Sequence, residues 1–375
     1  MFGRLKEMLI KEFIQIFRDP RTRFIILLPP IIQLVVFGYA VTTDVKNAAT
    51  AIYDQDNSVA SREIVSRFIR SRYFKVEKYI QQEEQIHRLI DHSRVKAVLQ
   101  INKGFEEDLR SGRTAQVQMI LDATDSNTAG ILLGYGQRIV QEYSQEILLD
   151  RVARSLGPVR SIGGLDLQSR AWFNDNLESR NFYVPGVIAI LLMLVTLMLT
   201  SMAIVREKEM GTMEQIMVTP ISSMEFILGK TIPFGLIGFF DMVLVVLIAW
   251  GWFEVPVRGS LGWLFLGTGL YLMTTLGMGL LISTISRTQQ QALMITFFYF
   301  QPMILLSGFM FPIDNMPEVV QWLTYLDPLR YFLVIIRGIF LKGIGPEILW
   351  PQMLALLVMG LVVFQLAVSR FKKYI

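Results

Sequence analysis

Few side chains in this sequence could carry out chemistry, and their types and spacing exclude most kinds of active site. Cysteine is absent and only two histidines occur, so thiolate nucleophiles and thiolate metal sites are excluded. His87 and His92 are five residues apart, about 140° around a helix, and do not form the i, i+4 pair of a zinc helix. No Ser/His/Asp grouping stands out, and we expect no catalytic site, metal site or cofactor.

Four aspartates flank the ends of predicted strands: Asp54, Asp56, Asp122 and Asp125. Carboxylates at such positions usually accept hydrogen bonds in turns and at helix N-termini. We expect that role here, and a bound cation is the alternative.

Asp241 is the only charged residue within six long apolar stretches of the chain. An ionisable residue inside a membrane segment is a candidate for function. Asp241 could relay a proton or a cation, or it could be a carboxyl near the middle of a span that is hydrogen-bonded to a neighbouring helix or partly protonated. Gln301 is a weaker candidate, because glutamines in such stretches usually form hydrogen bonds between helices.

Gly229-Lys230-Thr231 resembles the end of a phosphate-binding loop. The motif requires its first glycine where this chain has Met224, and it requires a preceding strand. Neither condition holds, so any ATP must be bound by another subunit.

The elements that must position these groups are apolar. Hydrophobic residues make up 52% of the 375 and charged residues only 18%. Six stretches without lysine or arginine cover 24–43, 181–205, 231–253, 259–286, 288–313 and 348–369. Each reaches the roughly 20 residues that a helix needs to cross a bilayer. This excludes a soluble protein and predicts an α-helical polytopic membrane protein with six transmembrane helices.

Lysine and arginine flank these stretches unequally. Thirteen lie in residues 1–23, the 206–230 loop, Arg287 and the C-terminal tail, against four in the short loops on the opposite side. The positive-inside rule therefore predicts that both termini are cytoplasmic. The net charge of +4 is modest, and we expect no nucleic-acid partner.

Residues 44–180 have the composition of a folded soluble domain. Strands are predicted at 48–53, 74–80, 95–101 and 117–121, alternating with helices at 59–70, 83–92, 105–110 and 129–152. This alternation predicts an inserted α/β domain. It lies outside the cytoplasm, because long domains are translocated regardless of their charge.

Three shorter segments lie near the membrane surface. Within 1–23, apolar residues recur at three- and four-residue steps up to Asp19-Pro20, which predicts an amphipathic helix on the inner membrane surface. The 206–230 loop predicts a short helix that exposes methionines, which need a partner or lie on the membrane. Within 314–347, Leu329–Phe340 is apolar but too short to span, which predicts an interfacial or re-entrant helix.

Three segments that follow one another along nearly the whole chain also resemble a known family. They are Lys11-Glu-Phe-Ile-Gln-Ile-Phe-Arg18-Asp-Pro20, Arg206-Glu-Lys-Glu-Met-Gly211-Thr-Met-Glu214-Gln-Ile-Met-Val-Thr-Pro220, and Leu306-Ser-Gly308 through Pro312 with Asp327-Pro328 and Ile336-Arg-Gly338. The chain thereby resembles the permease subunits of type-2 ABC exporters. It is most similar to bacterial inner-membrane multidrug-efflux permeases with a large periplasmic domain.

The resemblance implies sites and partners. The residues that would contact or couple to the ATPase are Glu209, Gly211, Thr212, Met213, Glu214, Ile216, Met217, Thr219 and Pro220. The residues of the N-terminal connecting helix are Lys11, Glu12, Phe13, Arg18 and Asp19. The implied partners are ABC ATP-binding subunits, a second permease copy or close relative in a dimer, a periplasmic adaptor (membrane fusion) protein and the lipid membrane.

The resemblance implies an ATP-driven exporter of an amphipathic or hydrophobic substrate, drug-like or lipid-like, without a nucleotide site of its own. The alternative is an ion-gradient-driven secondary transporter that uses Asp241. Such a transporter usually has several polar residues in the membrane and inverted repeats, and neither is evident here.

Overall fold

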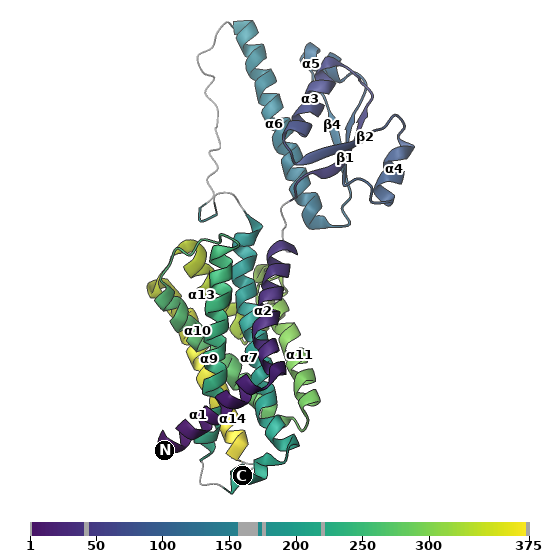
Figure 1. The fold of residues 1–375 in the computed structure, drawn as a ribbon. Coiled ribbons are helices and arrows are strands. Elements are labelled where there is room, and N and C mark those ends of the chain that lie inside the picture. The colour runs from purple at the N-terminus through teal and green to yellow at the C-terminus, as the bar shows by residue number, and fades with distance from the viewer. Residues whose placement is uncertain (1, 41–44, 157–171, 175–177, 219–221, 373–375) are drawn as a thin grey trace. The chain divides into compact units, whose positions relative to one another are not determined.

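The computed structural model describes residues 2–40, 45–156, 172–174, 178–218 and 222–372 (Figure 1). The chain forms two compact units. The larger unit combines Met1–Thr42 with Arg170–Ile375, and the smaller unit is Thr43–Ser169. In the sequence, the smaller unit therefore lies between two parts of the larger one.

The smaller unit is built on a four-stranded sheet in the order β2-β1-β3-β4. The strands are β1 Ala48–Asp54, β2 Phe74–Tyr79, β3 Ala97–Ile101 and β4 Val117–Leu121. The helices are α3 Val59–Arg70, α4 Glu84–Asp91, α5 Phe105–Ser111 and α6 Ser126–Leu156. β1 pairs in parallel with β2 and β3, and β4 is antiparallel to β3. Each predicted strand and helix is confirmed at close to its predicted bounds.

Side chains from the two faces of the sheet form two separate hydrophobic cores. Ile52 and Leu99 face one side and pack with Phe68 of α3 and Leu132 of α6. Their neighbours along the strands face the other side and pack against α4. Because successive strand residues point to opposite faces, the sheet is covered by helices on both sides.

The aspartates at the strand ends accept hydrogen bonds in turns. Asp54 accepts the backbone N–H groups of Asp56 and Asn57 at 3.0 and 2.9 Å. Asp56 accepts the N–H of Gly104 at 2.8 Å, and Asp125 accepts that of Asn127 at the start of α6, at 3.1 Å. The turn and capping roles predicted for these carboxylates are confirmed.

The larger unit is a helical bundle around α7. Its helices are α1 Phe2–Arg18, α2 Pro20–Ala40, α7 Ser179–Glu209, α8 Thr212–Met217, α9 Ser223–Gly251, α10 Leu261–Ile285, α11 Gln289–Leu306, α12 Glu318–Thr324, α13 Pro328–Arg337 and α14 Pro346–Lys372, with short 3₁₀ and π turns at Ile313–Asn315 and Gly338–Lys342. Helix α7 packs against α2, α9, α10, α11 and α13 (Figure 1). It is apolar on all sides, as is typical of a helix surrounded by others.

Four helices in the described residues, α7, α9, α10 and α14, are long and apolar enough to cross a membrane, and α12 with α13 makes a fifth if the bent pair is one span. The predicted count was six. The described apolar part of α2, Ile26–Tyr39, is shorter. Helix α11 begins with three glutamines, which lower its mean hydropathy.

Helices α12 and α13 meet at an angle of 77°. Asp327 makes this turn, because its carboxylate accepts the N–H of Leu329 at 2.9 Å and Pro328 follows as the first helical residue. Both are standard signals for starting a helix. The pair has the form of a broken span or a re-entrant loop.

Candidate functional site

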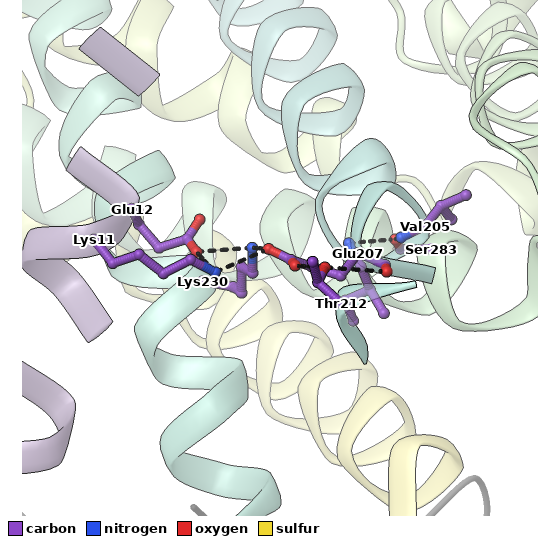
Figure 2. Close-up of polar contacts among 8 residues, drawn as sticks. Lys11, Glu12, Val205, Glu207, Thr212, Lys230 and Ser283 are labelled. Carbon is purple, nitrogen blue, oxygen red and sulfur yellow. Dashed lines mark hydrogen bonds and ion pairs between the residues drawn. The ribbon is translucent and has the colours of Figure 1, made fainter. Parts of the chain in front are cut away.

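Four helices meet at a group of polar side chains that we call the Lys230 cluster (Figure 2). Its members are Lys11 and Glu12 of α1, Glu207 of α7, Thr212 of α8 and Lys230 of α9. Two of these residues come from the N-terminal helix, and the other three come from the end of α7 to the start of α9, about midway along the sequence. The cluster therefore joins the first helix of the chain to the short helix after α7.

Local sequence sets where these helices begin and end. Gly211 has φ +70°, a backbone conformation that residues with a Cβ rarely adopt, so α7 ends there and α8 turns away. Ser222 and Glu225 form a capping box that begins α9. Lys230 consequently lies in the second turn of α9, inside the helix.

Lys230 is the centre of the cluster. Its side chain is only 2% exposed, and its ammonium donates a 2.6 Å hydrogen bond to Oε1 of Glu207. The same ammonium lies 2.8 Å from Oε1 of Glu12. That second contact is an ion pair without hydrogen-bond geometry, since Glu12 Oε1 accepts no hydrogen bond from the described residues.

Two further groups complete the environment of Glu207. The ammonium of Lys11, which is half exposed, donates to Oε1 at 3.1 Å, and the hydroxyl of Thr212 donates to Oε2. The cluster thus balances two lysines against two carboxylates. Burying charges is tolerated only when they are paired in this way.

The residues on either side of Glu207 in the last turn of α7 also contact other elements. Arg206 pairs with Asp19, between α1 and α2, at 3.4 Å. Lys208 donates to the carbonyl of Thr284 at the end of α10, at 3.1 Å. Glu209 accepts the N–H of Gln289 at the start of α11, at 2.8 Å. Together with Glu207, described above, these residues make up the run 206–209. Its four side chains connect α7 to five other helices or to their ends.

A serine on α10 reaches the same turn of α7 from another side. The hydroxyl oxygen of Ser283 accepts the backbone N–H groups of Ile204 and Val205 at 3.1 and 3.2 Å (Figure 2). Ser283 is fully buried. The end of α7 is thus fixed to α10 through its backbone as well as its side chains.

A pocket of about 340 Å³ opens beside the cluster. Glu12, Asp19, Arg206 and Lys230 form part of its polar lining, and Leu199 and Phe234 form part of its apolar wall. The pocket keeps the ion pairs close to solvent. The arrangement is suited to holding helices in register.

The structure brings together some of the predicted coupling residues and separates others. Thr212 points into the Lys230 cluster, and Glu209 is engaged by Gln289 within the chain. Glu214 is exposed on α8. Ile216 and Met217 lie on α8, whereas Thr219 and Pro220 fall outside the described residues.

The prediction that the methionines of this segment are exposed is wrong for Met213. Its side chain is 8% exposed and packs with Met8, Ile204 and Phe226. Helix α8 turns back onto the bundle after Gly211, so this methionine completes the chain's own core. Met210, which precedes the turn, is exposed.

The connecting-helix residues have separate roles. Lys11 and Glu12 belong to the Lys230 cluster, and Asp19 pairs with Arg206. Phe13 stacks against Phe17 with the ring centroids 6.3 Å apart. Arg18 is exposed at the end of α1.

The two membrane-path candidates differ in burial. Asp241 is buried in α9, and neither of its carboxylate oxygens has a hydrogen-bond partner in the described residues. Within the part of the chain that the structure describes, the expected hydrogen bond from Asp241 to a neighbouring helix is not formed, and partial protonation stays a prediction. Gln301 is exposed on α11.

Sequence reasoning missed Glu207 and Lys230 as functional residues. Lys230 was considered only as part of a false phosphate-binding motif and as one of the basic residues that set the orientation. A signal was present, because four consecutive charged residues, 206–209, follow an apolar stretch. Helical geometry points such residues in different directions, so some of them must face the bundle and need partners there.

Comparison with known proteins identifies the type of molecule. Residues 20–369 match the family model of ABC-2 family transporter proteins. The chain is 35% identical over 373 residues to the probable multidrug ABC transporter permease YbhR of Escherichia coli (strain K12), covering 100% of this chain and 99% of that one. The chain belongs to the ABC-2 transporter family.

Two further Escherichia coli (strain K12) relatives agree. The probable multidrug ABC transporter permease YbhS is 34% identical over 94% of this chain and 93% of its own length. The inner membrane transport permease YhhJ is 30% identical, with 92% of each chain covered. The chain is therefore a permease subunit of an ABC exporter that works with an ATP-binding partner in a membrane, and ion-gradient transport through Asp241 is not favoured.

Proposed function

We propose that this permease moves a drug-like or lipid-like amphipathic substrate out of the cytoplasm or inner leaflet of a bacterial inner membrane. Relatives named as probable multidrug permeases support this substrate class. The active unit is a dimer with a second copy or a close relative, together with two ATP-binding subunits. The ATP is hydrolysed on those subunits.

In this proposal both termini are cytoplasmic and six helices span the membrane. Helices α2 and α11 join α7, α9, α10 and α14 as spans, because both pack against α7 in the bundle. The α12–α13 pair is an external re-entrant segment. Residues 44–180 form the periplasmic α/β domain, which meets an adaptor protein.

The Lys230 cluster is the observation that carries the coupling mechanism. An ATP-binding subunit that contacts Glu214 on α8 would move Thr212, which is bonded to Glu207. Glu207 is bonded to Lys230 of α9 and Lys11 of α1. A push on α8 is thereby passed to the first turns of one spanning helix and to the connecting helix.

The nature of the contacts fits this role. A buried ion pair adds little stability compared with apolar packing, and its best-attested use is to fix register or to switch. The cluster contains two such pairs, which join α9 to α1 and to α7. We infer that its pairs hold one state of the bundle and exchange partners in the other.

The test is co-purification from native membranes in nanodiscs. Wild-type chain should retain an ATP-binding subunit, identified by mass spectrometry, and Glu214→Arg should lose it through charge reversal at the contact. Glu347→Arg, an equal charge change on an exposed residue at the start of α14, should retain the subunit. If both variants retain the ATP-binding subunit equally, α8 is not the contact with that subunit.

A further inference from the structure

Helix α1 has two apolar faces, and only one of them is covered by the bundle. Met8 and Ile16 are buried against the other helices, on the same face as Glu12 of the Lys230 cluster. Ile14 and Phe17, on another face, are 57% and 60% exposed. A surface helix of a soluble domain needs one apolar stripe, so the second face requires a different apolar environment.

A groove of about 290 Å³ lies on this second face, where α1, α2 and α9 meet. We call it the α1 groove. Its lining is almost entirely apolar and includes Phe13, Phe17, Leu27, Leu236 and Phe240, with Arg23 as its one charged residue. The volume is near the lower limit of ligand pockets, ~300 Å³, which suits part of a chain-like molecule.

The walls of the α1 groove continue into the outward faces of membrane helices. Leu236 and Phe240 of α9 are about half exposed, and α9 is long and apolar enough to span. Outward apolar residues on a spanning helix contact lipid tails. A lipid acyl chain is therefore already beside the mouth of this groove.

Arg23 supplies the charge complementarity. It lies in the first turns of α2, between the charged α1 segment and the apolar run that begins at Phe24. Among the residues that the structure describes, no carboxylate pairs with its guanidinium. Arginine forms strong, often bidentate hydrogen bonds with phosphate, and basic residues at this level attract anionic headgroups.

We propose that the α1 groove binds one anionic phospholipid, with an acyl chain between α1, α2 and α9 and the phosphate on Arg23. This goes beyond the proposed transport function, and it requires only that the chain is embedded in a membrane. The bound lipid covers the exposed face of α1 and fixes that helix against the bundle. The position of the connecting helix then depends on lipid composition.

The test is native mass spectrometry of full-length protein released from nanodiscs that contain phosphatidylglycerol and phosphatidylcholine. Wild type should retain phosphatidylglycerol. Arg23→Gln should bind it about five-fold more weakly, the effect of one arginine near an anionic surface. Arg287→Gln, the same charge loss at an exposed position between α10 and α11, should match wild type.

A second variant tests the apolar part of the site. Leu27→Trp fills the groove and should lose phosphatidylglycerol while still eluting as a folded protein. Inorganic phosphate at millimolar concentration should fail to displace the lipid, and complete displacement would reduce the site to a phosphate site. Equal retention of phosphatidylglycerol by wild type and Arg23→Gln overturns the proposal.

The absence of cysteine allows a site-specific measurement. A fluorophore on Leu236→Cys should be quenched by phosphatidylglycerol with brominated acyl chains at lower lipid fractions than by brominated phosphatidylcholine. The same label on Leu247→Cys, another exposed residue of α9, should respond equally to both. Equal responses at Leu236, or crosslinking of Phe17→Cys to a second copy across the groove, would exclude a dedicated lipid site.

Discussion

At the scale of single residues, Lys230 determines whether two buried carboxylates are compensated. Without its ammonium, the one cation that Glu12 and Glu207 keep among the described residues is the half-exposed Lys11. We expect Lys230→Met to lower the free energy of unfolding by about 3–5 kcal/mol, the usual effect of leaving a buried charge unpaired. Thermal and denaturant unfolding of the purified protein in nanodiscs would measure it.

The control is Arg287→Met, a loss of the same charge at an exposed position, which should change stability by less than about 0.5 kcal/mol. Adding Glu207→Gln to Lys230→Met should restore part of the loss, because one uncompensated charge is removed. If Lys230→Met alone is neutral, the ion pairs do not stabilise the folded state as described.

Asp122 makes the stability of the smaller unit depend on pH. The ammonium of Lys96, 2.8 Å away, lowers the pKa of Asp122 to about 2, with further hydrogen bonds from Thr124. A carboxyl whose pKa is lower when folded contributes stability above its unfolded pKa of about 4 and loses it as pH falls towards 2. The unfolding temperature of this unit should therefore drop across that interval.

Scanning calorimetry of the full chain between pH 6 and 2 would detect this drop. Asp122→Asn should lower the transition temperature at pH 6 and flatten its dependence on pH. Asp91→Asn, at an exposed position at the end of α4, should leave the slope unchanged. If the transition temperature of Asp122→Asn falls with pH as steeply as that of wild type, Asp122 is not the cause of the pH dependence.

At the scale of secondary structure, the turn between α7 and α8 depends on one glycine. Gly211 has φ +70°, and a Cβ in this conformation costs about 1–2 kcal/mol. Gly211→Ala should lower stability by that amount. It should also reduce substrate-stimulated ATP hydrolysis by the assembled transporter, since α8 would no longer be held against Glu207.

Gly134→Ala is the matched control, because Gly134 lies within α6 and a Cβ there meets no atom within 4 Å. Alanine should stabilise this helix by up to about 1 kcal/mol. Hydrolysis should not change in this variant. Equal hydrolysis in Gly211→Ala would show that the turn does not contribute to coupling.

The elements were predictable from sequence to the extent that local pattern defines them. Short apolar runs located β1 and β3, and long apolar runs located α7 and α9, because burial on all sides leaves a continuous apolar stretch in the sequence. The Lys230 cluster leaves no such trace. Lys11 and Glu207 are 196 positions apart, and their contact depends on how α1 packs on α9. The burial of Met213 follows from the turn at Gly211 in the same way.

At the scale of the whole molecule, two units with separate cores should unfold separately. In the described ranges of the chain, the buried hydrophobic residues of the sheet unit and of the helical bundle form separate clusters. We expect two calorimetric transitions in the full chain. Asp122→Asn should move only one and Lys230→Met only the other, and a variant that shifts both transitions would show strong coupling between the units.

The connections of residues 206–209 also constrain how this family can exchange parts. Each of these four side chains is bonded to a different segment of the chain, from the end of α1 to the start of α11. We expect a hybrid that takes α1 and its end from a relative to assemble only if its residues at positions 11 and 19 complement residues 206–209 and its residue at position 12 complements Lys230. Substitutions here should therefore become fixed in compensating pairs across the sequence, and divergent relatives should differ at these positions together rather than singly.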